Sequence, residues 1–306
     1  MKRYERIVIC IDQPERDRRI LDYAAAVVRL AESKEVHLLH ASEKPSPGSD
    51  EATAGAEVAT PEALMHLAED HFDETVLSSC RYQVLQGAPL IQILRFAYEK
   101  EVDLIIIGRH YGQTDAAADD AVLPTRITRK ATCPVLVLPE ECEAKASTIL
   151  VPVRDSDCSA NALEAACGIA SRTTARVVAF NFYQVHGGYT RAGLTREEQL
   201  EQLEDIAKRE CERLIQCIDT WSVNVQIRCT PHFHSAVVPV VLDAIRSTSA
   251  DLVVIGARGR TGAAGVLLGA VTEQLIHKSP VPVLAVKKKG ECIGILRAWL
   301  TLAGEG

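Results

Sequence analysis

Long hydrophobic runs are missing from this sequence of 306 residues. No stretch reaches the roughly 18 uncharged apolar residues of a membrane-spanning helix. The start, MKRYERIVICIDQ, passes from charged residues into a strand-like segment without a signal-peptide pattern. Hydrophobic residues make up 47% of the chain and charged residues 25%, which is typical of a globular protein that buries a core. We therefore expect a cytoplasmic protein with no membrane partner.

Clusters of positive charge are also scarce. The formal net charge is −7, and the one basic run consists of Lys287, Lys288 and Lys289. Because nucleic-acid binding needs a concentrated basic patch, we expect no nucleic-acid partner. The ten cysteines form no Cys-x-x-Cys pair and mostly lie inside apolar runs such as IVICID and EAACGIA. This pattern favours buried free thiols over a disulfide or zinc framework.

Catalytic constellations are absent as well: there is no Ser-His-Asp order, nucleophile elbow or pair of carboxylates that can be placed across a cleft. His232 and His234 would share a face if they lay on a strand and could then chelate a metal, but no third ligand is evident. We expect these two side chains to form a polar pair facing a loop, and we expect His110 and His186 to lie in loops. No catalytic residue and no metal site is predicted.

What the sequence does contain is an internal repeat. Residues 103–138 align with residues 251–286 without a gap, at an offset of 148. Near the start of each half, IVICID at 7–12 aligns with ILVPVR at 149–154 at an offset of 142. Two copies of one domain, with the second longer by about six residues in its loops, account for both offsets.

Within each copy, short apolar runs alternate with helical patterns. Five strands with intervening helices indicate βαβ units and an open, mainly parallel sheet. The predicted fold is therefore two repeated five-stranded α/β sandwich domains of Rossmann-like type, also described as adenine nucleotide alpha hydrolase-like. The predicted strands are 7–11, 36–41, 82–86, 104–107, 134–138, 149–153, 176–182, 224–229, 252–255 and 282–286.

Local signals locate helices and boundaries. Thr60 before Pro61 is typical of an N-cap and first helical position. Thr195 and Glu198 have the spacing of a capping box and open a long helix. The apolar residues expected on one side of that helix are Leu200, Leu203, Ile206, Leu214 and Ile218. The polar stretch 139–147 is the predicted linker, so the expected domains are 1–140 and 147–290, followed by an apolar tail at 291–306.

A candidate ligand site follows the fourth strand of the second copy. Five glycines lie within fourteen residues there: Gly256, Gly259, Gly262, Gly265 and Gly269. A strand that ends in glycines and leads into a helix lets the backbone approach an anion and present its N–H groups. The segment lacks the G-x-x-x-x-G-K-[ST] pattern of a P-loop, and it follows the fourth strand and not the first, unlike a dinucleotide fingerprint.

This segment resembles the universal stress protein family, whose signature is Gly, two residues, Gly, nine residues, then Gly followed by Ser or Thr. The glycines at 256, 259 and 269 satisfy that spacing, and the resemblance spans both copies, including ILVPV, GAP at 87–89, PVLVL and PVLAV. It implies ATP or AMP, with or without Mg²⁺, bound in the second domain only. The implied binding residues are Pro152, Val153, Arg154, Asp155, Gly256, Ala257, Arg258, Gly259, Gly269, Ala270, Val271 and Thr272.

Two positions depart from the family pattern. Ala270 replaces Ser or Thr, which removes a hydroxyl donor worth about 1 kcal/mol but leaves the backbone amides. Arg154 replaces an Asp that contacts the nucleoside, so either Asp155 takes that role or Arg154 turns to a phosphate.

The first copy departs further. Asp12 keeps the acid, but Tyr111 replaces the second glycine, and carboxylates that would repel phosphates lie nearby. The positions concerned are Gly108, Tyr111, Asp115, Asp119, Asp120, Ala121 and Val122. We expect no ATP in this domain.

The resemblance implies a non-catalytic, nucleotide-responsive stress regulator. A nucleotide-independent interaction scaffold and a slow ATP hydrolase remain alternatives. Pro134 and Pro282 precede alternating apolar residues that suit edge strands. The family pairs such edges, which implies that the two domains pair within the chain through their last strands and that whole chains form a homodimer.

Overall fold

The computed structural model describes residues 4–42, 60–110, 123–185, 195–233, 236–257 and 268–288. The first half contains β1 (Arg6–Cys10), α1 (Pro14–Ala31), β2 (Glu35–Ser42), α2 (Pro61–Glu69), α3 (Glu74–Leu77), β3 (Cys80–Gln86), α4 (Pro89–Glu99), β4 (Leu104–Gly108), α5 (Leu123–Lys130) and β5 (Val135–Leu138). The second contains β6 (Thr148–Pro152), α6 (Asp157–Thr173), β7 (Arg176–Gln184), α7 (Arg196–Gln216), β8 (Val225–His232), α8 (Val238–Thr248), β9 (Leu252–Gly256), α9 (Ala270–Lys278) and β10 (Val283–Val286).

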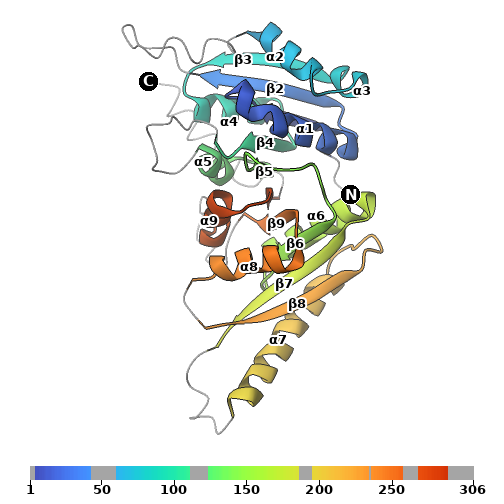
Figure 1. Cartoon of the computed structure of the whole chain (residues 1–306), viewed down its shortest axis with the longest axis vertical. Helices are drawn as coiled ribbons and strands as arrows, with labels where there is room; N and C mark the ends of the chain where they lie inside the picture. The colour runs from blue at the N-terminus through green and yellow to red at the C-terminus, as the bar shows by residue number, and fades with distance from the viewer. Residues whose placement is uncertain are drawn as a thin grey trace.

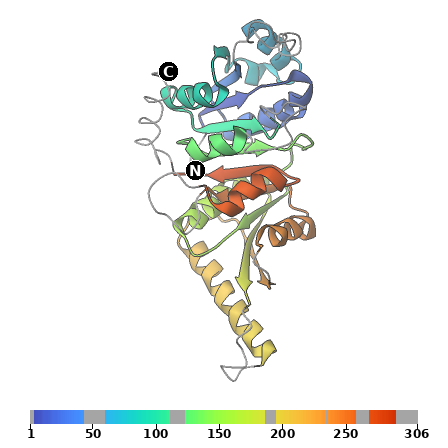
Figure 2. The same cartoon turned by 90° about the vertical axis from the view of Figure 1, so that its left-hand side faces the viewer.

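The ten strands form one continuous sheet in the order β3-β2-β1-β4-β5-β10-β9-β6-β7-β8 (Figures 1 and 2). Each half repeats the same strand order, and every pair within a half is parallel. The fold class predicted from the sequence is confirmed: two repeated, mainly parallel α/β domains. All ten predicted strands are present, with ends displaced by at most three residues.

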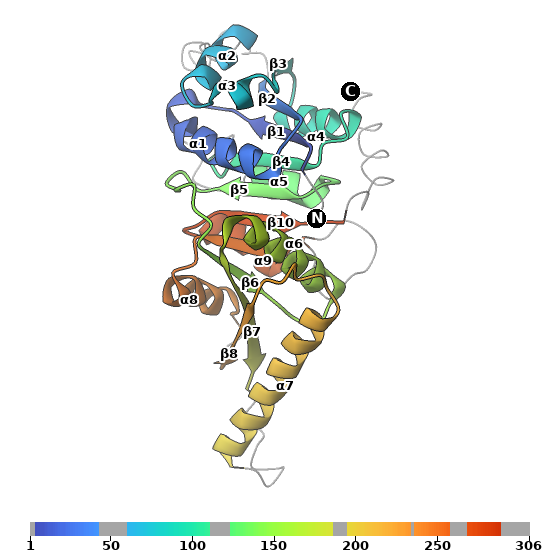
Figure 3. The same ribbon diagram turned by 90° about the vertical axis from the view of Figure 1, so that its right-hand side faces the viewer.

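Helices cover both faces of the sheet (Figure 3). Side chains of α1, α2, α3, α6 and α7 pack on one face, and those of α4, α5, α8 and α9 pack on the other. Because side chains alternate along a strand, Ile7 and Ile9 of β1 enter the first core while Val8 and Cys10 enter the second. Parallel strands buried on both faces explain why the runs are apolar without alternation.

The predicted helix starts are confirmed. The Thr60 side chain accepts a hydrogen bond from the Ala63 amide, with Pro61 next in the chain. Thr195 and Glu198 form the complete capping box at the start of α7. The predicted apolar side of α7 is wrong at Ile206, whose exposed fraction is 52%. A period of 3.6 residues brings Ala207 to the sheet in its place, and the buried residues of α7 are Ala207, Cys211 and Leu214.

The two halves meet where β5 runs antiparallel to β10, with Val137 opposite Val283. Helices α5 and α9 lie on the same face beside this seam, and two side-chain contacts join them. Thr125 Oγ1 lies 3.1 Å from His277 Nε2, and Arg129 donates to Glu273 at 2.9 Å. These four positions are related by the repeat offset, so the contacts are pseudo-twofold copies of each other.

A cation from each half also reaches the end of the opposite helix. Arg109 donates to the carbonyl oxygens of His277 and Ser279, at 3.2 and 2.7 Å. Lys287 donates to the carbonyl oxygens of Arg129 and Ala131, at 3.1 and 2.8 Å. Unpaired carbonyls at a helix C-terminus attract positive charge, so these contacts stabilise the seam.

No helix in the described ranges is long and apolar enough to cross a membrane. The described cysteines are free, and Cys10, Cys80, Cys133, Cys167 and Cys211 are buried. Among the described residues, no group of three His, Cys, Asp or Glu side chains could hold a metal ion.

Candidate functional site

The candidate site of the second domain lies where β9 ends and α9 begins. The Gly269 amide donates to the Ala257 carbonyl at 2.9 Å, and the Thr272 hydroxyl donates to the Gly256 carbonyl at 3.0 Å. These bonds bring four of the sequence-predicted residues together. Arg258, Gly259, Gly262 and Gly265 lie outside the described residues.

The packing of the second domain requires glycine at position 256, for a steric reason that the motif alone does not reveal. A Cβ atom at this position would lie 2.7 Å from the Cys158 carbonyl oxygen and 2.8 Å from the Cys158 Cβ. Both distances are shorter than real contacts allow, so only glycine permits this approach between β9 and the first turn of α6. The close packing fixes the start of α6 against the end of β9.

The first turn of α9 offers backbone donors. Gly269 is its N-cap residue and provides no side-chain cap. The Thr272 side chain is turned toward β9, and Ala270 and Val271 carry no hydroxyl. Helix N-termini combine unsatisfied N–H groups with the positive end of the helix dipole, an arrangement that suits an anion.

Arg154 lies at the carboxyl end of β6 and extends toward β7. Its amide donates to the Ser159 hydroxyl at 3.0 Å, and its guanidinium donates to the Phe182 carbonyl at 3.0 Å. The guanidinium also lies 5.2 Å from the centroid of the Phe182 ring, within the range of a cation–π contact. The side chain is therefore held along the end of the neighbouring strand in this structure.

The preceding Val153 is buried, and its amide continues the ladder by donating to the Phe180 carbonyl at 2.9 Å. Asp155 forms an ion pair with Arg213 of α7. The hydrogen bond and charge of Asp155 raise the pKa of Arg213. Both side chains are more than half exposed, so water and salt weaken the pair.

In the first domain, a buried ion pair lies beside the ends of β1 and β4. Asp17 Oδ2 accepts from the amides of Asp12 and Gln13, at 2.8 and 2.9 Å, and His110 Nε2 lies 3.0 Å from Asp17 Oδ1. Asp17 is 0% exposed and His110 3% exposed. His110 lies in the turn after β4, as expected, but its ring points into the protein.

A second ion pair lies nearby. Arg16 donates to both carboxylate oxygens of Glu140, each at 3.0 Å. The Arg16 bonds and charge lower the pKa of Glu140, with smaller contributions from His110 and Arg109. Sequence reasoning missed both pairs, because their partners are separated by about ninety residues or more along the chain.

Other predicted residues have mixed outcomes. Tyr111, Asp115, Asp119, Asp120, Ala121 and Val122 lie outside the described residues, as do His186 and His234. The expectation that His232 faces a loop is wrong: it is the last residue of β8 and is 5% exposed. It is paired with Gln184 on β7, and its carbonyl accepts from the Val185 amide at 2.9 Å.

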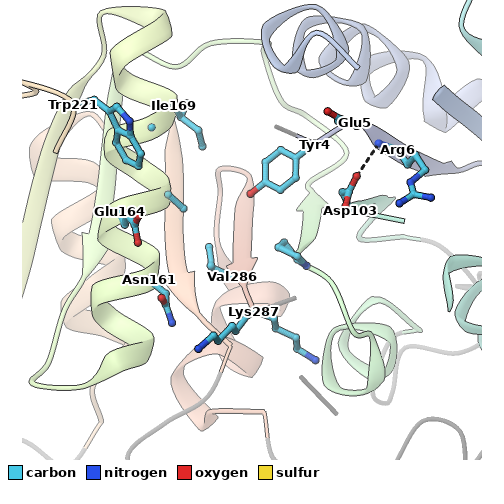
Figure 4. A pocket seen from close by; sticks show the side chains of 14 residues that line it. Tyr4, Glu5, Arg6, Asp103, Asn161, Glu164, Ile169, Trp221, Val286 and Lys287 are labelled. Atoms are coloured by element: carbon cyan, nitrogen blue, oxygen red, sulfur yellow. Dashed lines mark hydrogen bonds between the residues drawn. The ribbon is translucent and has the colours of Figure 1, made fainter. Parts of the chain in front are cut away.

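A cavity of about 410 Å³ lies elsewhere, between α6 and the amino ends of β1 and β4 (Figure 4). Tyr4, Glu164, Trp221 and Lys287 are among its lining residues. A more apolar cavity of about 210 Å³ adjoins it and shares Tyr4 and Ile169. None of the described residues that were predicted to bind a nucleotide lines either cavity.

Comparison with known proteins agrees with the repeat. The model of the universal stress protein family matches residues 3–139 and 145–287. An uncharacterized protein of Schizosaccharomyces pombe is 32% identical over 133 residues, which cover 43% of this chain and 22% of that protein. A universal stress protein of Methanocaldococcus jannaschii is 29% identical over 144 residues, which cover 46% of this chain and 81% of that protein.

Solved structures extend the likeness to both halves. A universal stress protein from Archaeoglobus fulgidus superposes with a TM-score of 0.63 at 17% identity, covering 94% of this chain and 99% of that chain. A functionally unknown protein from Pseudomonas aeruginosa also reaches 0.63, at 18% identity, covering 99% and 98%. At these identities the likeness shows the fold. Together with the two matches to the family model, it shows that this chain belongs to the universal stress protein family and carries two of its domains.

Proposed function

We propose that the second domain binds an adenine nucleotide, ATP or AMP, and that the chain is a non-catalytic stress regulator responding to that nucleotide. The proposed boundaries are 1–140 and 147–290. The residues proposed to bind are those at 152–155, 256–259 and 269–272. Mg²⁺ would accompany ATP through its phosphates.

The observation that carries the proposal is the junction of β9 and α9. Gly256, Ala257, Gly269 and Thr272 are joined by two hydrogen bonds, and the helix they open has no side-chain cap. A phosphate in front of that helix would receive N–H donors without obstruction from a side chain at Gly269. In the first domain, His110, which follows β4, lies 3.0 Å from the buried Asp17.

Nucleotide binding occurs elsewhere in the family. One universal stress protein has been solved in complex with cAMP; it superposes with a TM-score of 0.36 at 18% identity. That similarity is too low to carry its ligand or its site to this chain. The proposal rests on this chain's own glycine spacing and helix start.

Two alternative functions can be weighed against specific contacts in the structure. Arg154 already donates to the Phe182 carbonyl, which favours a scaffold that has lost nucleotide binding. A slow hydrolase needs a carboxylate near Mg²⁺. Asp155 is the candidate, and its ion pair with Arg213 counts against this alternative. We further propose that the pairing of β5 with β10 takes the place of a domain dimer, and that whole chains form cytoplasmic homodimers.

Calorimetric titration with ATP and AMP, followed by a phosphate-release assay, tests the proposal. We expect binding without phosphate release. Gly259→Tyr should abolish binding, because a ring would enter the glycine loop. The aligned residue of the first domain is already Tyr111, so the control is Gly112→Tyr beside it, which should leave binding unchanged. No heat of binding to the unmodified chain would support the scaffold, and released phosphate would support the hydrolase.

A further inference from the structure

Two cysteines face each other at the outer edge of the second domain. Cys211 lies on the buried side of α7, and its side chain is 0% exposed. Cys229 lies on β8, the last strand of the sheet, and is partly exposed. Figure 1 shows α7 running alongside β7 and β8 at this end of the molecule.

The alternation of side chains along β8 places Cys229 on the side of the strand that faces α7. Val225 and Ile227, four and two residues earlier on the same side of the strand, pack into the core beneath α7. Asn181, the residue paired with Cys229, donates to the carbonyl of Ala207, one turn before Cys211 on α7, so the two thiols lie on the facing sides of helix and strand.

Asn181 connects the strand that pairs with β8 to the helix. It is paired with Cys229 across β7 and β8. The amide nitrogen of Asn181 donates to the Ala207 carbonyl at 3.3 Å and to Glu210 Oε2 at 3.1 Å. Helix, strand and neighbouring strand thus all contribute to one fixed polar cluster.

The two thiols differ in acidity. The hydrogen bond from Cys211 lowers the pKa of Cys229, and Lys208 adds to that effect, while partial burial, Glu204 and Glu210 oppose it. The same bond and burial raise the pKa of Cys211. A more acidic, more exposed thiol beside a buried one is the arrangement of a reactive and a resolving cysteine.

Other uses of the cluster are less suited to it. No third metal ligand is present among the described residues, so the pair alone does not make a metal centre. Neither cysteine belongs to the residues proposed to bind the nucleotide.

We propose that Cys229 and Cys211 form a reversible redox pair whose oxidant is a hydroperoxide. The Cys229 thiolate attacks a peroxide oxygen, the O–O bond breaks, and the departing hydroxide takes a proton to leave as water. The resulting sulfenic acid is attacked by the Cys211 sulfur, which expels hydroxide; the Cys211 proton converts that hydroxide to a second water. Two thiols and one hydrogen peroxide thus give one disulfide and two waters. Two molecules of an external thiol then reduce the disulfide by exchange and leave as their own disulfide.

The disulfide would fasten α7 to the edge strand. This matters beyond the edge, because α7 also carries Arg213, the ion-pair partner of Asp155 at the end of β6. A covalent link should reduce the freedom of α7 and thereby of this ion pair. Disulfides also stabilise by constraining the unfolded chain, so oxidation should raise the Tm.

Peptide mapping of the full chain tests the pair. Trypsin places Cys211 in residues 210–213, Cys217 in 214–228 and Cys229 in 229–246, so each thiol is read separately. After treatment of the reduced protein with stoichiometric hydrogen peroxide, the linked peptides 210–213 and 229–246 should appear without reductant and disappear with dithiothreitol. Cys211→Ala should instead leave a Cys229 sulfenic acid that dimedone traps.

Cys217→Ser is the matched control, since Cys217 is exposed at the end of the same helix. The control should form the 211–229 link as the unmodified chain does, and Cys229→Ser should lose it completely. Circular dichroism of each variant before oxidation identifies any loss of fold. A folded chain in which peroxide oxidises Cys217 before Cys229, or links Cys229 to another cysteine, overturns the proposal.

Discussion

The two domains share one fold but treat the same position in opposite ways. In the first domain, Asp17 and His110 form a buried ion pair at the carboxyl ends of the strands. In the second, the residue aligned with Asp17 is Ser159, whose hydroxyl accepts from the Arg154 amide. Both side chains anchor the loop after the first strand of their domain, so the anchoring function is retained while the charge is not.

The comparison extends to a second pair of positions. Arg16 and Glu140 form a bidentate ion pair in the first domain, and the aligned residues of the second are Cys158 and Lys288. Oppositely charged side chains thus form an ion pair in the first domain, whereas the two aligned positions of the second domain hold a small residue and a basic one. The difference teaches that duplicated domains can exchange charged partners for small or basic residues with no change in strand order.

The largest expected effect comes from the buried ion pair. Asp17→Ala should lower the free energy of unfolding by about 3 to 5 kcal/mol, because it leaves His110 and two amides without their buried partner. Ser159→Ala should lower it by only about 1 to 2 kcal/mol, since one neutral acceptor is lost. Urea denaturation of both variants measures the difference.

Asp17→Asn is the control for charge, because its side-chain oxygen still accepts from the amides of Asp12 and Gln13. Its loss of unfolding free energy should lie between the losses of Asp17→Ala and Ser159→Ala. Equal losses for Asp17→Ala and Ser159→Ala would contradict the account of the first domain.

The next effect concerns the glycines that end β4 and β9. Gly256→Ala should destabilise the protein by about 1 to 3 kcal/mol, because its Cβ would meet backbone atoms of Cys158 that cannot turn away. The three atoms nearest to a Cβ at the matched Gly108 belong to side chains, and the nearest is the terminal Cδ1 of Ile20, which can shift, so Gly108→Ala should cost less. Thermal unfolding compares them; a larger loss for Gly108→Ala would show that the first site is the more tightly packed.

The smallest effect should be on ligand affinity. Arg154→Asp removes the guanidinium that is bonded to the Phe182 carbonyl and restores the acid that the family carries. We expect ATP to bind up to about tenfold more tightly, equivalent to about 1.4 kcal/mol. Arg154→Met, which removes the charge without adding a carboxylate, separates the two causes. Weaker binding by both variants would mean that the Arg154 guanidinium, and not only the backbone at this position, contacts the nucleotide.

Much of the fold could be predicted because it follows from local patterns. The apolar runs marked all ten strands, and Thr60 and Thr195 marked two helix starts through hydrogen bonds to residues three positions later. Ile206 shows the limit: a broad apolar stripe on a 21-residue helix leaves open which of two neighbouring positions faces the sheet. Packing against β7 and β8 made that choice.

The sites were less predictable because their contacts are long-range. The contacts of Arg16 with Glu140 and of Arg109 with the carbonyls at the end of α9 join residues that are brought together by the assembled sheet. The steric reason for Gly256 likewise depends on α6, which lies far away in the sequence. The glycine spacing identified the place, whereas the tertiary structure decides what each side chain there can contact.

The number and position of bound nucleotides test the central claim most directly. A crystal structure of the full chain grown with ATP should contain one nucleotide per chain, with its phosphates against the first turn of α9 and near Gly256, and none at Gly108. A nucleotide in the first domain, or an unoccupied second domain at saturating ATP, would contradict it.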